Sequence, residues 1–250
     1  MKIFLPENIF AKFLCDFLNV KDKKNVVFKP SALLTKFLHS EENSIALIPT
    51  LEIITNRELF ISHTVGISFG GSLCNSFIYY NNISEELNNL KLVGDVSSME
   101  VILSKILFKE LYNTDVQINI QTKTVDEVIR NFISIGDENF VNERFKQGIS
   151  FSEEMIEILS TPFVNYVLAS KDENTLSEVS ARMTEKIKSA SISEYLLQEP
   201  IPEESRNFIG ENFPKVFYSF DEQDIEGINQ LIRLPFYYDM IKDIIDVKFV

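Results

Sequence analysis

The stretch Asn25–Pro49, NVVFKPSALLTKFLHSEENSIALIP, decides the fold. Its two ends, residues 25–29 and 44–48, are short apolar runs that predict buried strands. The residues between them begin with Pro30 and Ser31 and then carry apolar side chains at helical spacing: Leu33, Leu34, Phe37 and Leu38. A strand, a helix and a strand in this order predict two parallel strands joined by a covering helix.

The same alternation continues on both sides of this stretch. Residues 2–5 are apolar enough for a strand, and residues 9–18 carry an apolar stripe at helical spacing. Residues 64–80 are strand-like but contain Gly70 and Gly71, and residues 162–169, PFVNYVLA, predict a later strand. Further patterns predict helices at 99–112, 124–132, 152–159, 175–189, 222–233 and 236–244, and a loop at 198–205.

These elements predict an α/β protein with two lobes. We expect residues 1–80 and 165–250 to form one lobe and residues 81–164 to form the other. Two hinge strands, near 66–80 and 162–169, would join the lobes and leave a ligand cleft between them.

The composition disfavours partners that are large polyanions. The chain has 24 Lys and Arg against 37 Asp and Glu, a formal net charge of −13. Binding to nucleic acid or to an anionic membrane depends on clustered basic side chains, so we expect neither partner. The first residues are interrupted by Glu7, Lys12 and Asp16 where a signal peptide would need an apolar run. We therefore expect a cytoplasmic protein with no membrane span.

Cysteine and histidine are too sparse for the common metal and redox motifs. Cys15 and Cys74 lie far apart in the sequence and neither belongs to a CxxC pair, so we expect free thiols, although a disulfide between them is possible. No metal-binding spacing of His, Cys or acidic residues is present, and we expect no metal and no cofactor.

The first candidate site is Ser97-Ser98-Met99-Glu100, at the start of a predicted helix. This spacing is typical of a capping box, in which Ser97 and Glu100 satisfy the first amides of the helix. The same spacing recurs at Thr124–Glu127 and Thr175–Glu178, so the spacing alone indicates only that a helix starts there. The functional alternative is that both serine hydroxyls and the free amides bind a carboxylate or a phosphate.

The other candidates follow predicted strands. Ser72 and Asn75 come after the glycine pair, which is otherwise typical of a bulge in a crossing strand. Thr50 and Asp137 each end a strand, and ligands of parallel α/β sheets bind beyond the carboxyl ends of the strands. An Asp in this position also forms turns and helix caps, which is the structural alternative.

Several stretches, in order along the chain, resemble the menaquinone-biosynthesis family of the futalosine route, which includes chorismate dehydratase. They are SALLTKFLHSEENSIALIPTLEI, GISFGGSLCNSFIYY, LVGDVSSMEVILSKILFKELY, the Ile-Gly-Asp at 135–137, STPFVNYVLAS and FYSFDEQDIEGINQLIRL. The resemblance implies the fold of the type II periplasmic binding proteins, with two α/β lobes and a ligand between them. It also implies a carbon–oxygen lyase that removes water from a small carboxylated substrate.

The resemblance assigns residues as well. The family's helix-capping serine motif falls on Ser97 and Ser98, with Glu100 in place of its usual threonine, and its Pro-Ser falls on Pro49 and Thr50. Its glycine-rich crossing falls on residues 70–76. The family's segment with a substrate-binding Asn differs here and reads Phe4-Leu5-Pro6-Glu7-Asn8-Ile9-Phe10, in which the resemblance offers Asn8 as the substitute. The expected partner is a small carboxylated ligand, bound by a monomer or a homodimer. The alternatives are a non-catalytic binder of small anions and a degenerate family member that serves as an interaction partner.

Overall fold

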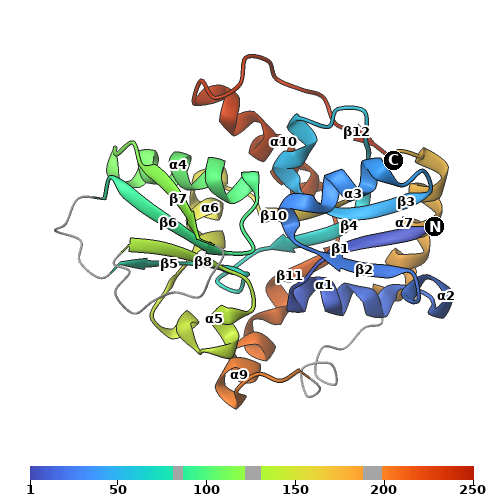
Figure 1. Ribbon diagram of the computed structural model, residues 1–250, viewed down its shortest axis with the longest axis horizontal. Helices are drawn as coiled ribbons and strands as arrows, with labels where there is room; N and C mark the ends of the chain where they lie inside the picture. Colours follow the sequence, from blue (N-terminus) through green and yellow to red (C-terminus); the bar gives the residue numbers. More distant parts are fainter. Residues whose placement is uncertain (81–86, 122–130, 188–198) are drawn as a thin grey trace.

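The strands form two separate sheets, each covered by helices, in a computed structural model that describes residues 1–80, 87–121, 131–187 and 199–250 (Figure 1). We call the first sheet with its helices the first lobe, and the second sheet with its helices the second lobe. The two-lobed α/β fold predicted from the sequence is confirmed.

The first sheet has the strand order β11-β4-β10-β3-β1-β2, with β12 added to β4. Its strands are β1 (Lys2–Pro6), β2 (Val26–Lys29), β3 (Ser44–Pro49), β4 (Phe60–Phe69), β10 (Phe163–Ser170), β11 (Val216–Ser219) and β12 (Lys248–Phe249). β1 runs parallel to both β2 and β3, with Ile3 opposite Val26 and Ile45, as the opening pattern predicts. β10 is antiparallel to β3 and to β4, so the sheet is mixed.

The helices of the first lobe follow from local sequence signals. They are α1 (Ile9–Leu14), α2 (Val20–Lys23), α3 (Leu34–Ser40), α7 (Glu173–Ile187) and α10 (Glu222–Tyr237). The predicted helix that begins after Pro30 starts as a 3-10 turn, Ser31–Leu33, before α3. α10 ends at Tyr237, so the helix predicted at 236–244 is wrong. α7 is capped by Asp172 rather than Thr175, which lies inside the helix, and Thr124–Glu127 lies outside the described residues.

The second sheet has the strand order β7-β6-β8-β5-β9. Its strands are β5 (Ser76–Tyr80), β6 (Asn89–Gly94), β7 (Gln117–Gln121), β8 (Asn131–Ile135) and β9 (Ile149–Ser150). Its helices are α4 (Ser98–Tyr112), α5 (Glu138–Val141) and α6 (Phe151–Leu159). β6 and β8 are parallel neighbours, and their carboxyl ends therefore lie at one edge of the sheet. Asn131 and Phe132 belong to β8; residues 124–130 of the helix predicted there lie outside the described part.

The chain crosses from the first sheet to the second between β4 and β5, and returns between α6 and β10. At the first crossing the amide of Gly70 donates to the carbonyl of Lys215 at 2.8 Å. A Cβ atom on Gly71 would meet the side chain of Lys215 at 2.5 Å, so the glycine pair allows another segment to approach closely.

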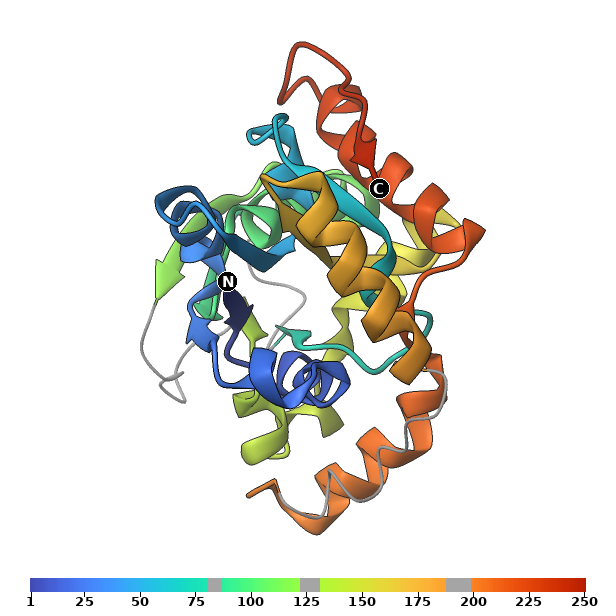
Figure 2. The same ribbon diagram turned by 90° about the vertical axis from the view of Figure 1, so that its right-hand side faces the viewer.

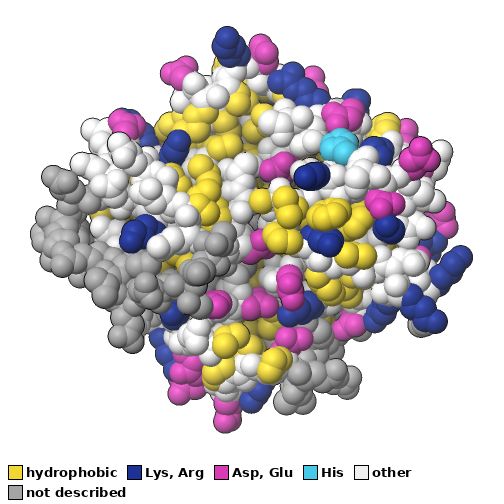
Figure 3. All heavy atoms as spheres, viewed as in Figure 1, with side chains coloured by type: hydrophobic (Ala, Val, Ile, Leu, Met, Phe, Trp, Pro, Cys, Tyr) yellow, Lys and Arg dark blue, Asp and Glu magenta, His cyan; other side chains and the backbone are white. Residues whose placement is uncertain are grey.

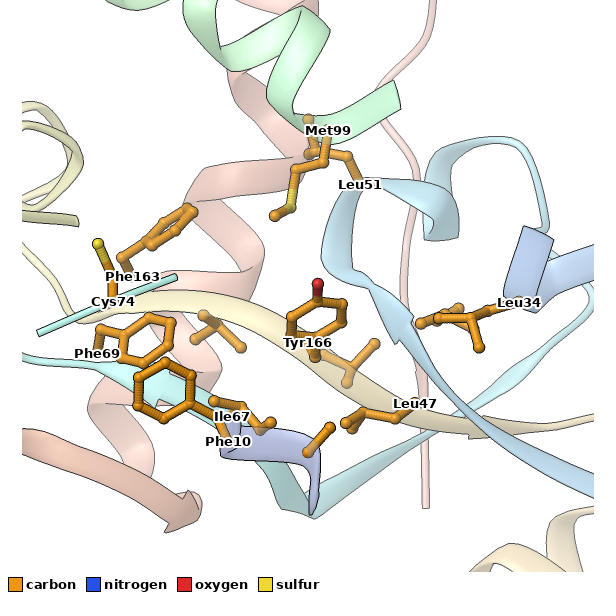
Figure 4. Close-up of a cluster of buried hydrophobic side chains, with 14 of the residues drawn as sticks. Phe10, Leu34, Leu47, Leu51, Ile67, Phe69, Cys74, Met99, Phe163 and Tyr166 are labelled. Atoms are coloured by element: carbon orange, nitrogen blue, oxygen red, sulfur yellow. The ribbon is translucent and has the colours of Figure 1, made fainter. Parts of the chain in front are cut away.

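The buried core is continuous across both lobes. Figure 4 shows Phe10, Phe69 and Phe163 grouped on one side of Tyr166, with Leu51 and Met99 above its hydroxyl. Met99 comes from α4 of the second lobe and Leu51 from the segment after β3 of the first. The lobes thus share apolar contacts where the polar groups described below also meet.

The loop predicted at 198–205 is observed at residues 199–202, whereas residues 203–205 belong to α9 (Glu203–Asn212), whose acidic first turn follows Pro202. Figure 2 shows α9 at the lower edge of the molecule, while α7 lies across the first sheet and contacts β4 and β10. α9 contacts the second lobe: Ser205 Oγ donates to the carbonyl of Phe140 at 2.6 Å, and the rings of Phe208 and Phe145 are stacked. In the described ranges no helix is long and apolar enough to cross a membrane.

Candidate ligand site between the lobes

Loops that follow parallel strands of both sheets meet between the lobes. From the first lobe come Asn8 after β1, Ser31 after β2 and Thr50 after β3. From the second come Asp95 after β6 and Asp137 after β8. Carboxyl ends of strands are the usual ligand edge of such sheets, and here two of these edges face each other. We call the region where Asn8, Ser31, Glu52, Asp95, Ser98, Asp137 and Tyr166 lie the interlobe junction.

Two similar turns supply the acidic side chains of the interlobe junction. β6 ends in Val93-Gly94-Asp95 and β8 ends in Ile135-Gly136-Asp137. Gly94 has a φ of 104° and Gly136 a φ of 118°, a backbone conformation that favours glycine. A Cβ atom on Gly94 would also lie 2.0 Å from the carbonyl oxygen of Ile135. The glycines thus allow both strands to turn sharply and direct an aspartate toward the first lobe.

Asp95 accepts two hydrogen bonds from Ser31. The amide nitrogen of Ser31 lies 2.8 Å from Oδ1, and the hydroxyl lies 2.6 Å from Oδ2. Burial raises the pKa of Asp95, and the charge of Glu7 acts in the same direction, while the two bonds from Ser31 oppose the rise. The carboxyl group is thus held by donors that suit a carboxylate, in surroundings that disfavour its charge.

Asp137 makes the corresponding contact with α1. Its Oδ1 accepts from the amide of Ile9 at 2.9 Å, and its Oδ2 lies 3.7 Å from Lys12 Nζ. Burial raises the pKa of Asp137 to about 6; the amide of Ile9 and the charge of Lys12 oppose this rise, and Glu199 and Glu7 add to it.

In a third contact across the junction, the carboxyl group belongs to the first lobe and the donor to the second. Glu52, in the 3-10 segment Thr50–Ile54 of the first lobe, accepts from the hydroxyl of Ser98 at the start of α4, at 2.6 Å. Its other oxygen lies 3.3 Å from the hydroxyl of Thr35. Each lobe therefore presents a carboxyl group to donors of the other.

Tyr166 is the centre of a buried polar group beneath these contacts. Its hydroxyl lies 2.9 Å from Ser31 Oγ and 3.5 Å from Asn75 Nδ2. Asn165 donates to Asn75 Oδ1 at 2.8 Å. β10 has a bulge against β4 between Val164 and Tyr166. Because of this bulge, the consecutive residues Asn165 and Tyr166 both lie beside Asn75. Burial raises the pKa of Tyr166 well above its usual value, so this hydroxyl stays protonated.

The structure separates the predicted site residues into two groups. Asn8, Asn75, Ser98 and Asp137 lie in or directly beneath the interlobe junction. Asn8 caps α1 by accepting from the amide of Ala11 at 2.9 Å, and its buried Nδ2 has no partner among the described residues.

The remaining three have structural partners. Ser97 and Glu100 form the predicted capping box: Glu100 Oε2 accepts from the amide of Ser97 at 2.8 Å and from its hydroxyl at 2.6 Å. Thr50 donates to the carbonyl of Val164 at 2.6 Å, and Ser72 donates to Asn212 Oδ1 at 3.3 Å. In the present geometry these hydroxyls hold elements together.

Sequence reasoning missed Ser31, Glu52, Asp95, Asn165 and Tyr166 as site residues. One signal for Asp95 was present in the sequence, because Gly-Asp follows an apolar strand at both 94–95 and 136–137. A second signal was Pro30-Ser31 after β2, which parallels Pro49-Thr50 after β3. Tyr166 carried no such signal, since it lies in the middle of an apolar strand.

Negative charge predominates at the interlobe junction. Figure 3 shows acidic side chains along the middle of the face seen in Figure 1, where the two lobes meet. Glu7 is exposed beside Asp95 and Asp137, and Lys12 offsets part of this charge. Within the described ranges, no group of three or more His, Cys, Asp or Glu side chains is placed to hold a metal ion.

The fold is that of known periplasmic-type binding proteins. Protein AF1704 from Archaeoglobus fulgidus matches with a TM-score of 0.63 at 12% identity, over 96% of this chain and 98% of its own. The Candida albicans CA3427 gene product, described as having the generic periplasmic binding protein fold, matches with a TM-score of 0.54 at 11% identity, over 97% and 91%. The periplasmic aliphatic sulphonate binding protein SsuA from Escherichia coli matches with a TM-score of 0.51 at 12% identity, over 99% and 90%.

These likenesses confirm the fold predicted from the sequence resemblance. By sequence, no family model and no curated protein matches the chain.

Proposed function

We propose that this protein binds a small carboxylated metabolite between its two lobes. The supporting observation is that hydrogen-bond donors at the interlobe junction already hold carboxyl groups: Ser31 holds Asp95, and Ser98 holds Glu52. Amide and hydroxyl donors in such pairs suit a carboxylate of a ligand equally well. Because the junction is acidic, the ligand would replace these side chains rather than add its charge to theirs.

Ligand entry requires that the lobes separate and close again. In this proposal residues 1–80 with 165–250 move against residues 81–164, about hinges near 66–80 and 162–169. Two elements of the first range move with the second lobe instead: β5, which pairs with β8 and β9, and α9, which contacts Phe140 and Phe145. The similar protein from Escherichia coli binds aliphatic sulphonates, which are also small anions. The free thiols of Cys15 and Cys74 suit a reducing compartment, so we place this activity in the cytoplasm, in a monomer or a homodimer.

A carbon–oxygen lyase of the chorismate dehydratase type is the second candidate. The segments that resemble the menaquinone-biosynthesis family favour it, and they include the serine pair at the start of α4. Loss of water that produces an aromatic ring needs a well-positioned substrate more than a strong base. Ser98, Asn75 and Asn8 would position the substrate through hydrogen bonds, and Thr50, Ser72, Ser97 and Asp137 complete the proposed set.

Thermal unfolding with a panel of small acids tests the proposal. Chorismate, prephenate, shikimate and simple dicarboxylates are added separately, and a true ligand at 100 times its Kd should add about 2.7 kcal/mol of stability. Any stabilising compound is then followed by ultraviolet absorbance, since turnover distinguishes a lyase from a binding protein. If no compound of the panel raises the unfolding temperature, the proposal is wrong for this class of ligand.

Two serine variants show where the ligand binds. Ser98→Ala removes a donor of the interlobe junction and should reduce the stabilisation by ligand. Ser40→Ala is the matched control, because Ser40 is an exposed serine at the end of α3 whose hydroxyl donates to the carbonyl of Phe37. Equal stabilisation of both variants would remove Ser98 from the site.

A further inference from the structure

We propose that the two Gly-Asp turns of the second lobe form a latch that holds the two lobes together. The latch consists of the bonds from Ile9 to Asp137 and from Ser31 to Asp95. It rests on the proposed function, because it regulates access to that same site.

The two aspartates are fixed to the second lobe. The amide of Asp95 donates to the carbonyl of Ile135 at 3.0 Å, and the amide of Gly136 donates to the carbonyl of Asn75 at 2.7 Å. Gly94 and Ile135 are also paired in the parallel ladder between β6 and β8. Neither aspartate can therefore follow the first lobe if the lobes separate.

The donors are fixed equally firmly to the first lobe. Ile9 begins α1, whose start is held by Asn8, and Ser31 follows the end of β2, which pairs with β1. The donating groups at Ile9 and at Ser31 include backbone amides, which no side-chain rotation can move away. Separation of the lobes must consequently break all three hydrogen bonds, and closure must restore them together.

The charges around the latch make it releasable. Glu7 and Glu199 bring negative charge near Asp137, and Glu7 also brings negative charge near Asp95. Lys12 is the basic group that faces Asp137 from α1. Hydrogen bonds between an amide and a carboxyl group favour closure, whereas burial of a charged carboxylate opposes it. The balance between these two effects is what permits a ligand to replace the aspartates.

The test uses the ligand-free full chain and the double variant Asp95→Ala with Asp137→Ala. X-ray scattering should give a larger radius of gyration than for the wild type. Amide hydrogen exchange, followed by NMR, should become faster by about tenfold or more at Ile9 and Ser31. Exchange at Ala11 should stay the same, because its amide is held by Asn8 within the first lobe. Unchanged scattering and unchanged exchange at Ile9 and Ser31 would overturn the latch.

Two further variants separate the latch from general destabilisation. Asp221→Ala removes the carboxylate that caps α10 inside the first lobe, so it should lower stability without enlarging the molecule. Asp137→Asn keeps an oxygen that accepts from Ile9, so exchange at Ile9 should remain slow, whereas Asp137→Ala should accelerate it; equal exchange in these two variants would also overturn the latch. If the double variant does not fold, this pair of single variants carries the test. No ligand takes part, so failure of the ligand panel leaves this result standing.

Discussion

Asp95 and Ser31 are 64 residues apart in the sequence, and the aspartate accepts hydrogen bonds from both the amide and the hydroxyl of the serine. Such a two-point contact fixes the orientation of the carboxyl group as well as its position. The turn that presents Asp95 is therefore a sensitive place for substitution.

Gly94→Ala should destabilise the protein more than Gly136→Ala. Both glycines have positive φ angles that alanine adopts only with strain of about 1–3 kcal/mol. At Gly94 the added Cβ would also meet the carbonyl of Ile135, whereas at Gly136 it would meet no atom of the described residues within 4 Å. Urea unfolding measures the free energy of unfolding of each variant. A larger loss of this free energy for Gly136→Ala than for Gly94→Ala would contradict the geometry of the two turns.

Asp137→Asn should change the dependence of stability on pH. The pKa of Asp137 is raised from 3.8 to about 6, so the folded protein binds this proton more tightly than the unfolded chain does. The resulting contribution to stability is complete below about pH 4 and is lost as the pH rises through about 6.

Relative to the wild type, the Asn variant should therefore gain of order 2 kcal/mol in unfolding free energy between pH 4 and pH 7. Urea unfolding at several pH values measures this difference. A difference between the two proteins that stays constant across the range would contradict the raised pKa.

Ser97→Ala and Ser98→Ala should have different effects on the ligand-free protein. Ser97 is buried and caps α4, so its loss should lower the free energy of unfolding by about 1–2 kcal/mol. Ser98 is exposed, and its loss should change stability by less than about 0.5 kcal/mol. Chemical unfolding of both variants checks the prediction, and equal losses would show that the capping box does not determine the stability of α4.

Thr50→Val should be destabilising although it preserves shape. The hydroxyl of Thr50 is buried and donates to the carbonyl of Val164 in β10, which would lose this donor. The expected loss is about 1–3 kcal/mol. Thr55→Val is the control, because Thr55 is exposed at the end of the same 3-10 segment. If both variants unfold at the same urea concentration, the Thr50 bond contributes nothing measurable.

The elements of the fold were predictable where apolar periodicity was strong. The strands around Ile3 and Ile45 and the long helix α4 were expected close to their observed bounds. α9 was not, because its acidic first turn and preceding proline resemble a loop, and its position depends on contacts with Phe140 and Phe145 that no local pattern contains.

The site was predictable in part for a related reason. A residue after a parallel strand is a reasonable candidate from sequence alone, and Asp137 was proposed in this way, whereas Asn8 was proposed from the family resemblance. Whether a hydroxyl already has a hydrogen-bond partner depends on residues distant in the sequence, such as Val164 for Thr50 and Asn212 for Ser72. Tyr166 became a candidate only when the bulge in β10 placed it beside Asn75 and Ser31.

The placement of α9 has a mechanical consequence. In the sequence, α9 lies between α7 and β11, which both belong to the first lobe. In space, however, Ser205 and Phe208 attach it to the second lobe, at α5 just after the Asp137 turn and at Phe145. During any rotation of the lobes, α9 would therefore move with the second lobe. Residues 213–215, which join α9 to β11 of the first sheet, would then change their backbone angles as the lobes rotate.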